Sequence, residues 1–292
     1  MPLCAELCEL TTTDGQALHG LLYTPPEGPS DARAVLIVHG VSGTFYQRPY
    51  PQLSEALARR GFTTLVANNR GHDWVARAGD GSPTSGATYE MFEHCVLDID
   101  AGLNHLAERG FEQFALVGHS LGATKVVYYQ GTRHRADVAA VVVCSAPMLF
   151  YSTRRLEQPG FDELLARAQA MVAEGRGEEL FHARAGSGPG LFSARTYVNK
   201  YGPEEHTDVR PLAERVGCPL LAMCGSAEFS PNFVPYAREI AERAGGASHV
   251  IDGATHNYAG CEDEVGNLIA DWLRRTAAPS AAARPASASP GR

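Results

Sequence analysis

The sequence predicts an α/β fold in which a mostly parallel β-sheet is covered by helices on both faces. Short apolar runs rich in β-branched residues alternate with longer stretches of helical periodicity, which is typical of such sheets. Residues 34–38 and 139–144 are continuous apolar runs, as expected of strands that are buried on both faces. The chain of 292 residues has a suitable length for one such domain.

The N-terminal segment predicts a hairpin of antiparallel strands. Residues 5–10 and 18–23 have the composition of strands, and Asp14-Gly15 between them is a typical hairpin turn. After the strand at 34–38, apolar residues at helical spacing predict a helix that ends at Gly61. Further strands are expected at residues 63–67, 114–117, 139–144, 220–223 and 249–251, and further helices at residues 89–109, 121–130 and 262–275.

One interval interrupts this alternation of strands and helices. Residues 149–209 contain no convincing strand, but they include an amphipathic helix at 161–173 and a glycine-rich loop at 186–190. A segment of this length with a helix of its own is more typical of an inserted cap than of a structureless loop. We therefore expect a core built from residues 1–148 and 210–275, with the cap inserted between the two parts.

The bulk composition excludes several classes of function. A net charge of −8 provides no basic surface for nucleic acid and no attraction to an anionic membrane. The longest strongly apolar stretch, residues 138–150, is too short to span a bilayer. Residues 276–292 consist of Ala, Pro, Ser, Gly, Arg and one Thr, so we expect this tail to be disordered. The expected partner is a small molecule, with neither nucleic acid nor membrane.

The cellular location is expected to be the cytoplasm. The N-terminus has no basic segment followed by an apolar one, so a secretory signal is not expected. Seven cysteines are scattered without CxxC spacing, which fits a reducing compartment. The richness in Ala, Arg and Gly is typical of a bacterium with a GC-rich genome. The sequence leaves the oligomeric state open, with a homodimer as one option.

Ser120 is the strongest candidate for a catalytic side chain. It lies in Gly118-His119-Ser120-Leu121-Gly122, between a predicted strand and a predicted helix. Gly-x-Ser-x-Gly is a weak pattern alone, but this context is the one in which a nucleophilic serine is lifted clear of a sheet on a strained turn. The flanking glycines are required because a Cβ there would clash with neighbouring backbone. The alternative is a serine that merely caps the helix.

His256 is the histidine best placed to activate Ser120. A serine hydroxyl is a poor nucleophile unless a base takes its proton. His256 follows the last predicted strand, and loops at the carboxyl ends of parallel strands gather at one edge of the sheet. His39 and His119 lie beside glycines in tight turns and are interpreted as positioning residues. His72 is interpreted as structural.

Glu228 is the candidate for the acid that orients His256. In this architecture the chain order is serine, acid, histidine, and Glu228 follows the strand at 220–223 after a short glycine turn. Asp208 is a poorer candidate, and the strand at 139–144 is followed by no acid. Asp is the usual residue at this position, so the longer Glu requires a loop that sits slightly further back.

Acyl transfer also needs hydrogen-bond donors for the developing oxyanion. The backbone amide of Leu121, directly after the nucleophile, is one candidate. The second is the amide of Val41, in the loop after residues 34–38, where Gly40 allows the chain to turn inward. The alternative for Val41 is an ordinary turn at the end of a strand.

Aromatic side chains near these loops are candidates for the substrate pocket. Phe45 and Tyr46 follow the loop of Val41, and Phe150 and Tyr151 begin the predicted cap. Such side chains either line a pocket or pack the cap helices, and the sequence favours neither. The same alternatives hold for Phe181, Phe192, Tyr197 and Tyr201.

Five motifs in order and spacing resemble the landmarks of the α/β-hydrolase superfamily. They are His39-Gly40, Asn69-Arg70-Gly71-His72, Gly118-His119-Ser120-Leu121-Gly122, Gly225-Ser226-Ala227-Glu228 and Gly253-Ala254-Thr255-His256. The resemblance covers roughly residues 5–275. It implies an eight-stranded, mostly parallel sheet with helices on both faces and a helical cap inserted after the sixth strand. A serine at the position of the nucleophile argues against dehalogenases and epoxide hydrolases, whose nucleophile is a carboxylate.

These residues predict hydrolysis of an ester, thioester or related acyl bond of a small molecule. Ser120 attacks, His256 transfers the proton, and water releases the acyl group from an acyl-enzyme. The mechanism needs no cofactor, and no metal-ligand cluster is expected. Two alternatives remain open. One is a lyase, cyclase or acyltransferase with the same triad, and the other is a binding protein without catalysis.

Overall fold

The computed structural model describes residues 3–77, 84–185 and 188–276. Apart from Thr276, the tail predicted to be disordered (276–292) lies outside the described residues. Two residues of the predicted glycine-rich loop, 186–187, also lie outside them. Within the described part, no helix is long and apolar enough to cross a membrane.

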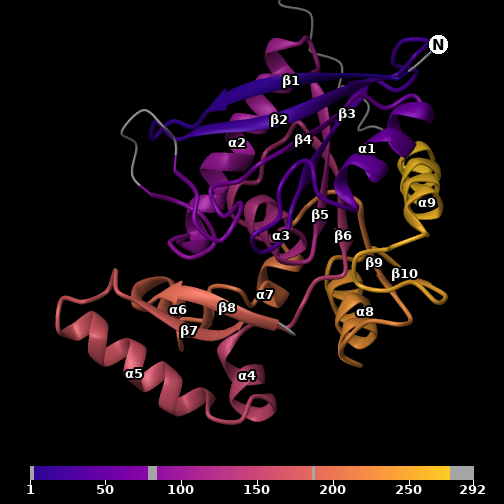
Figure 1. Ribbon diagram of the computed structural model, residues 1–292. Helices are drawn as coiled ribbons and strands as arrows, with labels where there is room; N and C mark the ends of the chain where they lie inside the picture. Colours follow the sequence, from indigo (N-terminus) through magenta and orange to yellow (C-terminus); the bar gives the residue numbers. More distant parts are fainter. Residues whose placement is uncertain (1–2, 78–83, 186–187, 277–292) are drawn as a thin grey trace, which may run out of the picture.

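An eight-stranded sheet forms the centre of the molecule (Figure 1). The strands lie in the order β1 (Cys4–Thr11), β2 (Ala17–Thr24), β4 (Thr64–Ala67), β3 (Arg33–Val38), β5 (Gln113–His119), β6 (Val138–Cys144), β9 (Leu220–Gly225) and β10 (Ala247–Ile251). β1 and β2 form the predicted antiparallel hairpin, and β2 also pairs antiparallel with β4. The remaining strands are parallel to one another. The predicted eight-stranded, mostly parallel sheet is confirmed.

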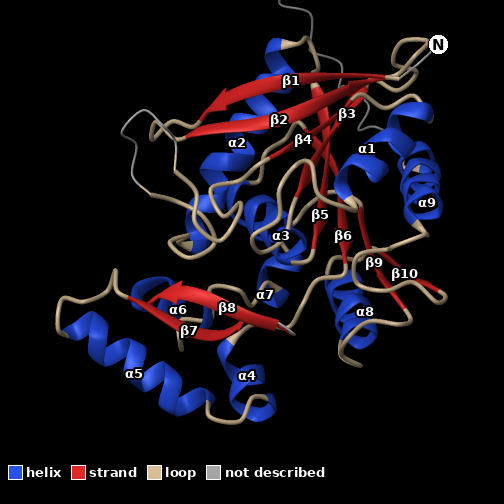
Figure 2. Ribbon diagram, in the orientation of Figure 1, coloured by secondary structure: helices blue, strands red, loops and turns tan. Residues whose placement is uncertain are grey.

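Helices cover both faces of this sheet, as Figure 2 shows. One face is covered by α1 (Tyr50–Arg59) and α9 (Glu262–Arg275), and the other by α2 (Cys95–Glu108), α3 (Leu121–Arg133) and α8 (Phe233–Arg243). The helix expected at 89–109 begins later, with the short 3₁₀ helix η1 (Phe92–His94) before α2. No helix was predicted at the position of α8, although its buried residues recur at helical spacing: Phe233, Tyr236, Ala237, Ile240 and Ala241.

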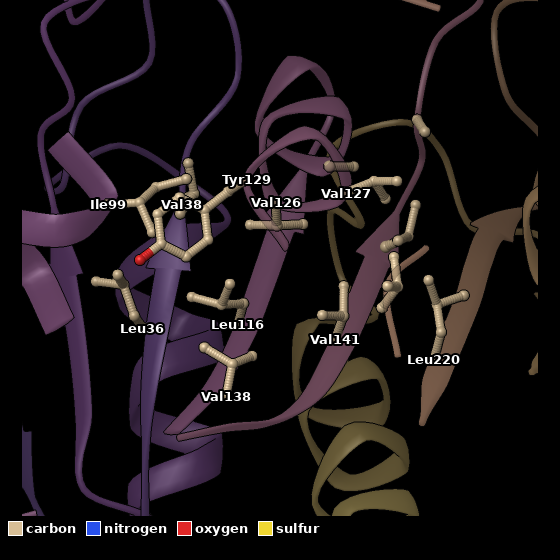
Figure 3. Close-up of a cluster of buried hydrophobic side chains, with 14 of the residues drawn as sticks. Leu36, Val38, Ile99, Leu116, Val126, Val127, Tyr129, Val138, Val141 and Leu220 are labelled. Carbon is tan, nitrogen blue, oxygen red and sulfur yellow. The ribbon is translucent and has the colours of Figure 1, made fainter. Parts of the chain in front are cut away.

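Side chains that alternate along β3 explain why both faces need cover. Val35 and Ile37 pack toward α1 and α9, whereas Leu36 and Val38 pack toward α2 and α3. All four are buried, and burying each is worth about 1.5–3 kcal/mol. Figure 3 shows buried side chains on the face covered by α2 and α3. There Leu36 and Val38 lie with Ile99, Leu116, Val126, Val127, Tyr129, Val138, Val141 and Leu220.

The segment between β6 and β9 forms a separate layer beside the sheet, below it in Figure 1. It contains α4 (Tyr151–Glu157), α5 (Phe161–Ala173), β7 (Leu180–Ala185), β8 (Gly188–Ser193) and α6 (Ala194–Tyr201). The short helix α7 (Arg210–Ala213) that follows packs on α3 and α8. The range of α5 is the predicted one. Aromatic side chains of this segment form a core of their own, and Phe92 and Leu121 from outside the segment join it. In the rest of the article the part from α4 to α6 is called the cap.

The expectation that residues 149–209 contain no strand is wrong. β7 and β8 pair as an antiparallel hairpin, and residues 188–190 of the predicted glycine-rich loop belong to β8. Phe181 pairs with Phe192 across the hairpin and both are buried, whereas His182 is exposed. The hairpin is stabilised by packing of this face on the cap helices. Both strands are short and β8 contains two glycines and a proline, so the alternation is too weak to be predicted.

Candidate active site

Five parallel neighbours in the sheet, β3, β5, β6, β9 and β10, end at one edge and bring their following loops together. Val41 follows β3, Ser120 follows β5, and Ser145 follows β6. Glu228 follows β9 and His256 follows β10. The topology therefore gathers side chains that are up to 215 residues apart in sequence, between Val41 and His256, at a single place.

Ser120 lies on a strained turn between β5 and α3. Its φ of 56° and ψ of −128° are unusual for a residue with a side chain. A Cβ on Gly118 would lie 2.2 Å from the carbonyl oxygen of Gly122, and one on Gly122 would lie 2.0 Å from that of Val38. A Cβ on Gly40 would lie 2.7 Å from the Cβ of Ser120. The glycines are therefore required by close packing around the turn, as the sequence predicts.

Ser120, His256 and Glu228 form a continuous chain of hydrogen bonds. The Nε2 atom of His256 lies 3.0 Å from the hydroxyl oxygen of Ser120, and its Nδ1 lies 2.8 Å from a carboxylate oxygen of Glu228. A carboxylate can only accept, so Nδ1 carries the proton and Nε2 is free to accept the serine proton. The structure thus brings together the three side chains that the sequence selects, in the arrangement a proton transfer needs.

The longer side chain of Glu228 is held by a second serine. Ser145 donates through its hydroxyl to Oε1 of Glu228, the oxygen that does not face His256. Because that carboxylate only accepts, the hydroxyl of Tyr258, 2.7 Å away, donates to Ser145. Burial raises the pKa of Tyr258 well above its usual value, so the phenol stays protonated. Both Ser145 and Tyr258 have positive φ angles, which marks strain close to the site.

Sequence reasoning missed Ser145 and Tyr258 as parts of the site. Ser145 lies directly after a predicted strand, at the edge where the candidate residues gather. That position was discounted because no acid follows the strand. The missed signal is that a residue after one strand, here Ser145, can donate a hydrogen bond to the acid that follows the neighbouring strand, here Glu228. Tyr258 carried no signal, because a tyrosine two residues after a histidine is equally compatible with a core position.

A second network connects His256 to the loop of Val41. The amide of Gly40 donates to the hydroxyl of Tyr50, at 2.9 Å, and that hydroxyl lies 3.1 Å from Nδ1 of His119. Nε2 of His119 lies 2.7 Å from the backbone carbonyl of His256 and must donate to it. Burial lowers the pKa of His119 to about 3, so the ring is neutral and its Nδ1 accepts from Tyr50. His119 is a positioning residue, as the sequence indicates.

The Tyr50→Phe substitution is expected to weaken both the fold and the site. It leaves the amide of Gly40 and Nδ1 of His119 buried without partners, at a cost of about 1–3 kcal/mol in the free energy of unfolding. Displacement of the two loops is expected to lower kcat by roughly 10- to 100-fold. Urea denaturation and steady-state kinetics measure the two effects. A variant that keeps wild-type kcat would show that this network does not position the site.

His39 orients the peptide group before Val41. The amide of Asn69 donates to Nε2 of His39, so the Nδ1 proton is directed to the carbonyl oxygen of Gly40, 2.8 Å away. Burial lowers the pKa of His39 to about 3, and the ring is neutral. The carbonyl of Gly40 and the amide of Val41 belong to one trans peptide, so the Val41 amide points away from His39. Among the described residues, neither this amide nor that of Leu121 has a hydrogen-bond acceptor.

A cavity of about 270 Å³ opens at Ser120 and His256. The Ser120 cavity, as we call it, is also lined by Gly40, Val41, Gly43, Gln47, Arg48, Tyr50, His119, Pro147, Leu149, Phe229 and Asn257. Phe229 and Phe233 pack against the ring of His256. Their ring centroids lie 4.8 and 5.2 Å, respectively, from the centroid of the imidazole. These contacts restrict the movement of the His256 ring.

The four aromatic residues expected to line the pocket do not do so in the described structure. Phe45 packs against the core, and Tyr46 stacks edge-on against it with 60% of its surface exposed. Phe150 is buried between Tyr236 and Arg210, and Tyr151 packs on Phe161. Leu149, one position before Phe150, lines the cavity instead. Phe181, Phe192, Tyr197 and Tyr201 pack the cap core, which decides between their two alternatives.

The remaining candidates are placed as follows. Nδ1 of His72 lies 2.8 Å from the carboxylate of Asp73 within a loop, in keeping with a structural role. Asp208 pairs with Arg210 and does not contact His256. Within the described chain, no group of His, Cys, Asp and Glu side chains could hold a metal ion.

The chain belongs to the alpha/beta hydrolase family, whose model matches residues 35–268. Solved structures of the same fold cover nearly the whole chain. The structure described as ferulic acid bound to Est1E from Butyrivibrio proteoclasticus is 18% identical, with a TM-score of 0.70, and the match covers 92% of this chain and 99% of that one.

Two further solved structures share the fold. DcsB in complex with its substrate analogue has a TM-score of 0.72 at 16% identity, over 94% of this chain and 100% of that one. A highly thermostable carboxyl esterase from Bacillus coagulans has a TM-score of 0.69 at 14% identity, over 94% and 99%. No curated protein matches the chain significantly by sequence.

Proposed function

We propose that this protein is a serine hydrolase that cleaves an ester, thioester or related acyl bond of a small molecule. The observation that carries the proposal is the unbroken hydrogen-bond chain from Glu228 through His256 to Ser120, the last two of which line a cavity. Solved structures of the same fold include proteins described as esterases, which supports this choice of reaction. The proposal includes a cytoplasmic location and a substrate small enough for the Ser120 cavity.

The proposed reaction proceeds through an acyl-enzyme. The hydroxyl of Ser120 attacks the carbonyl carbon of the substrate while Nε2 of His256 takes the proton. The amides of Leu121 and Val41 stabilise the oxyanion. His256 then protonates the leaving alcohol or thiol. Water, deprotonated by His256, attacks the acyl-enzyme and releases the acid. Glu228 keeps the imidazole in the required tautomer and stabilises its cation throughout.

Labelling by a fluorophosphonate tests the proposed nucleophile. We expect one adduct per chain, on Ser120, located by peptide mass spectrometry. In parallel, p-nitrophenyl esters of graded acyl length are incubated with the protein in water, and the products are identified. Release of the free acid at the rate of p-nitrophenolate supports hydrolysis. A rearranged or transferred acyl product would instead favour a cyclase or acyltransferase, and absence of both label and turnover would contradict the proposal.

A further inference from the structure

A second cavity lies beside the Ser120 cavity. It has a volume of about 220 Å³ and is lined in part by residues of α4 in the cap. Pro147, Leu149 and Phe229 line both cavities, so the two adjoin across these apolar side chains. A substrate whose acyl bond lies at Ser120 and whose distant end passes these three side chains would reach the second cavity, which we call the Arg154 cavity.

Arg154 of α4 supplies an unusual charge to this cavity. The residue is only 5% exposed, and its guanidinium makes one hydrogen bond in the described structure, from Nη1 to the side-chain oxygen of Gln158. Its Nε is buried and has no partner. The guanidinium stacks on the ring of Tyr201, 4.3 Å from the centroid, which holds it in place. The edge formed by Nε and Nη2 remains without an acceptor.

No other buried cation of the described chain is left in this way. The other buried Arg and Lys side chains each pair with a carboxylate: Arg33 with Asp31, Arg70 with Asp14 and Asp98, and Lys125 and Lys200 with Glu90. A buried charge is costly unless it is paired and hydrogen-bonded. The missing carboxylate at Arg154 therefore indicates a place where a ligand provides one.

The other charges of the cavity agree with an anionic ligand. Arg184 of β7 also lines it and is exposed. The one carboxylate in the lining, that of Glu157, accepts a hydrogen bond from the side-chain amide of Asn232. Two guanidinium groups and one engaged carboxylate leave the lining net positive, in a chain whose net charge is −8.

We propose that the Arg154 cavity binds a carboxylate at the end of the substrate remote from the scissile bond. The preferred substrates are then esters with a terminal carboxylate, such as half-esters of linear dicarboxylic acids. The planar guanidinium of Arg154 is suited to a carboxylate, which can accept from two parallel N–H groups. This inference rests on the proposed function, because it concerns the substrate of the same site.

A pair of esters that differ only in charge tests the proposal. The p-nitrophenyl half-esters of glutaric, adipic and suberic acids are compared with the same esters whose free carboxyl group is methylated. We expect the wild type to favour the charged form of the best length by roughly 10- to 100-fold in kcat/KM. Equal rates for both forms, or preference for the methylated form, would overturn the inference while leaving ester hydrolysis established. Hydrolysis of neither form would instead count against the proposed function.

The Arg154→Met variant identifies the group responsible. It is expected to lose this preference and to keep kcat/KM for the methylated ester within about threefold. Arg155→Met is the matched control, since Arg155 neighbours it in α4 but is exposed and pairs with Asp162; this variant should retain the preference. An equal loss for both esters in Arg154→Met would show that Arg154 only packs the cap.

A binding measurement keeps the test independent of turnover. Calorimetric titration of the wild type with the dicarboxylate product should show binding that weakens by roughly 10- to 100-fold in Arg154→Met. An ester ending in a phosphonate distinguishes the kind of anion. A higher kcat/KM for the phosphonate ester than for the carboxylate ester would overturn the assignment to a carboxylate. A lower kcat/KM for the phosphonate ester supports that assignment.

Discussion

Replacing Ser120 by alanine is expected to lower kcat for ester hydrolysis by roughly 10⁴- to 10⁶-fold, with little change in KM. The substitution removes the atom that forms the acyl-enzyme but leaves the cavity and the amides of Leu121 and Val41 in place. Binding of substrate therefore persists while the covalent route is lost. Stopped-flow or long-time p-nitrophenolate assays measure kcat, and circular dichroism verifies the fold.

Ser226→Ala is the matched serine control for that measurement. Ser226 lies at the same sheet edge, where it is exposed and bonds Asp252 and the amide of Gly253. Because its hydroxyl forms hydrogen bonds with Asp252 and Gly253 and not with Ser120 or Glu228, its loss is expected to change kcat by less than about threefold. A Ser120→Ala enzyme that retains more than about a tenth of wild-type kcat would assign the nucleophile to another residue.

Replacing Glu90 by alanine is expected to destabilise the fold by roughly 3–5 kcal/mol. Glu90 is fully buried, and its two carboxylate oxygens bond Lys125 of α3 and, at 2.6 Å, Lys200 of α6. Both lysines are also buried. Removal of the carboxylate leaves two like charges close together without a counter-charge. Urea denaturation measures the loss as a lower midpoint of unfolding.

Glu90, Lys125 and Lys200 together are called the Glu90 cluster. Loss of Glu90 should also lower kcat, because this cluster is connected to the candidate active site. Lys125 donates to the side-chain oxygen of Asn69 at 3.0 Å, and the amide of Asn69 holds His39. Glu93→Gln is the control. Glu93 also contacts the cap, through a hydrogen bond from Asn199, but Glu93 is only partly buried. We expect that variant to lose less than about 1 kcal/mol. Equal losses for the two variants would show that the buried charges add nothing beyond an ordinary contact.

Acid provides an independent test of the Glu90 cluster. Burial alone would raise the pKa of Glu90, but the charges of Lys125 and Lys200 outweigh it and lower that pKa to about 2. The folded state therefore binds fewer protons at Glu90 than the unfolded state, whose pKa is near 4.5. This contribution is complete above pH 4.5 and is lost as the pH falls toward 2. The Glu90→Gln variant should lack that part of the acid dependence.

The positions of the eight strands, their mostly parallel arrangement and the three residues of the proton-transfer chain were predictable; the order of the strands across the sheet was not predicted. Apolar runs such as 34–38 indicate buried parallel strands, and parallel strands carry their following loops to one edge. Ser120, Glu228 and His256 could then be selected as strand-end residues with suitable chemistry. The extra methylene of Glu228 is accommodated by Ser145, a contact that depends on two strands being neighbours and on the rotamer of one side chain.

The pocket residues were not predictable, because the direction of a loop side chain has no period. Phe150 and Leu149 are adjacent, yet the leucine faces the cavity and the phenylalanine enters the core. Arg154 had no distinguishing signal, since an arginine in an amphipathic helix is normally solvated. Its burial results from packing on Tyr201, a residue far along the chain.

The ion cluster at Glu90 has a consequence for protein engineering. Two of its members, Glu90 and Lys125, lie outside the cap, and the third, Lys200, lies within it. A chimera that receives the cap of another hydrolase without a lysine at this point would lose one of the two ion pairs of Glu90. The cap is therefore not an interchangeable module. A transplant that aims at new specificity must either carry Lys200 with it or redesign both partners at the same time.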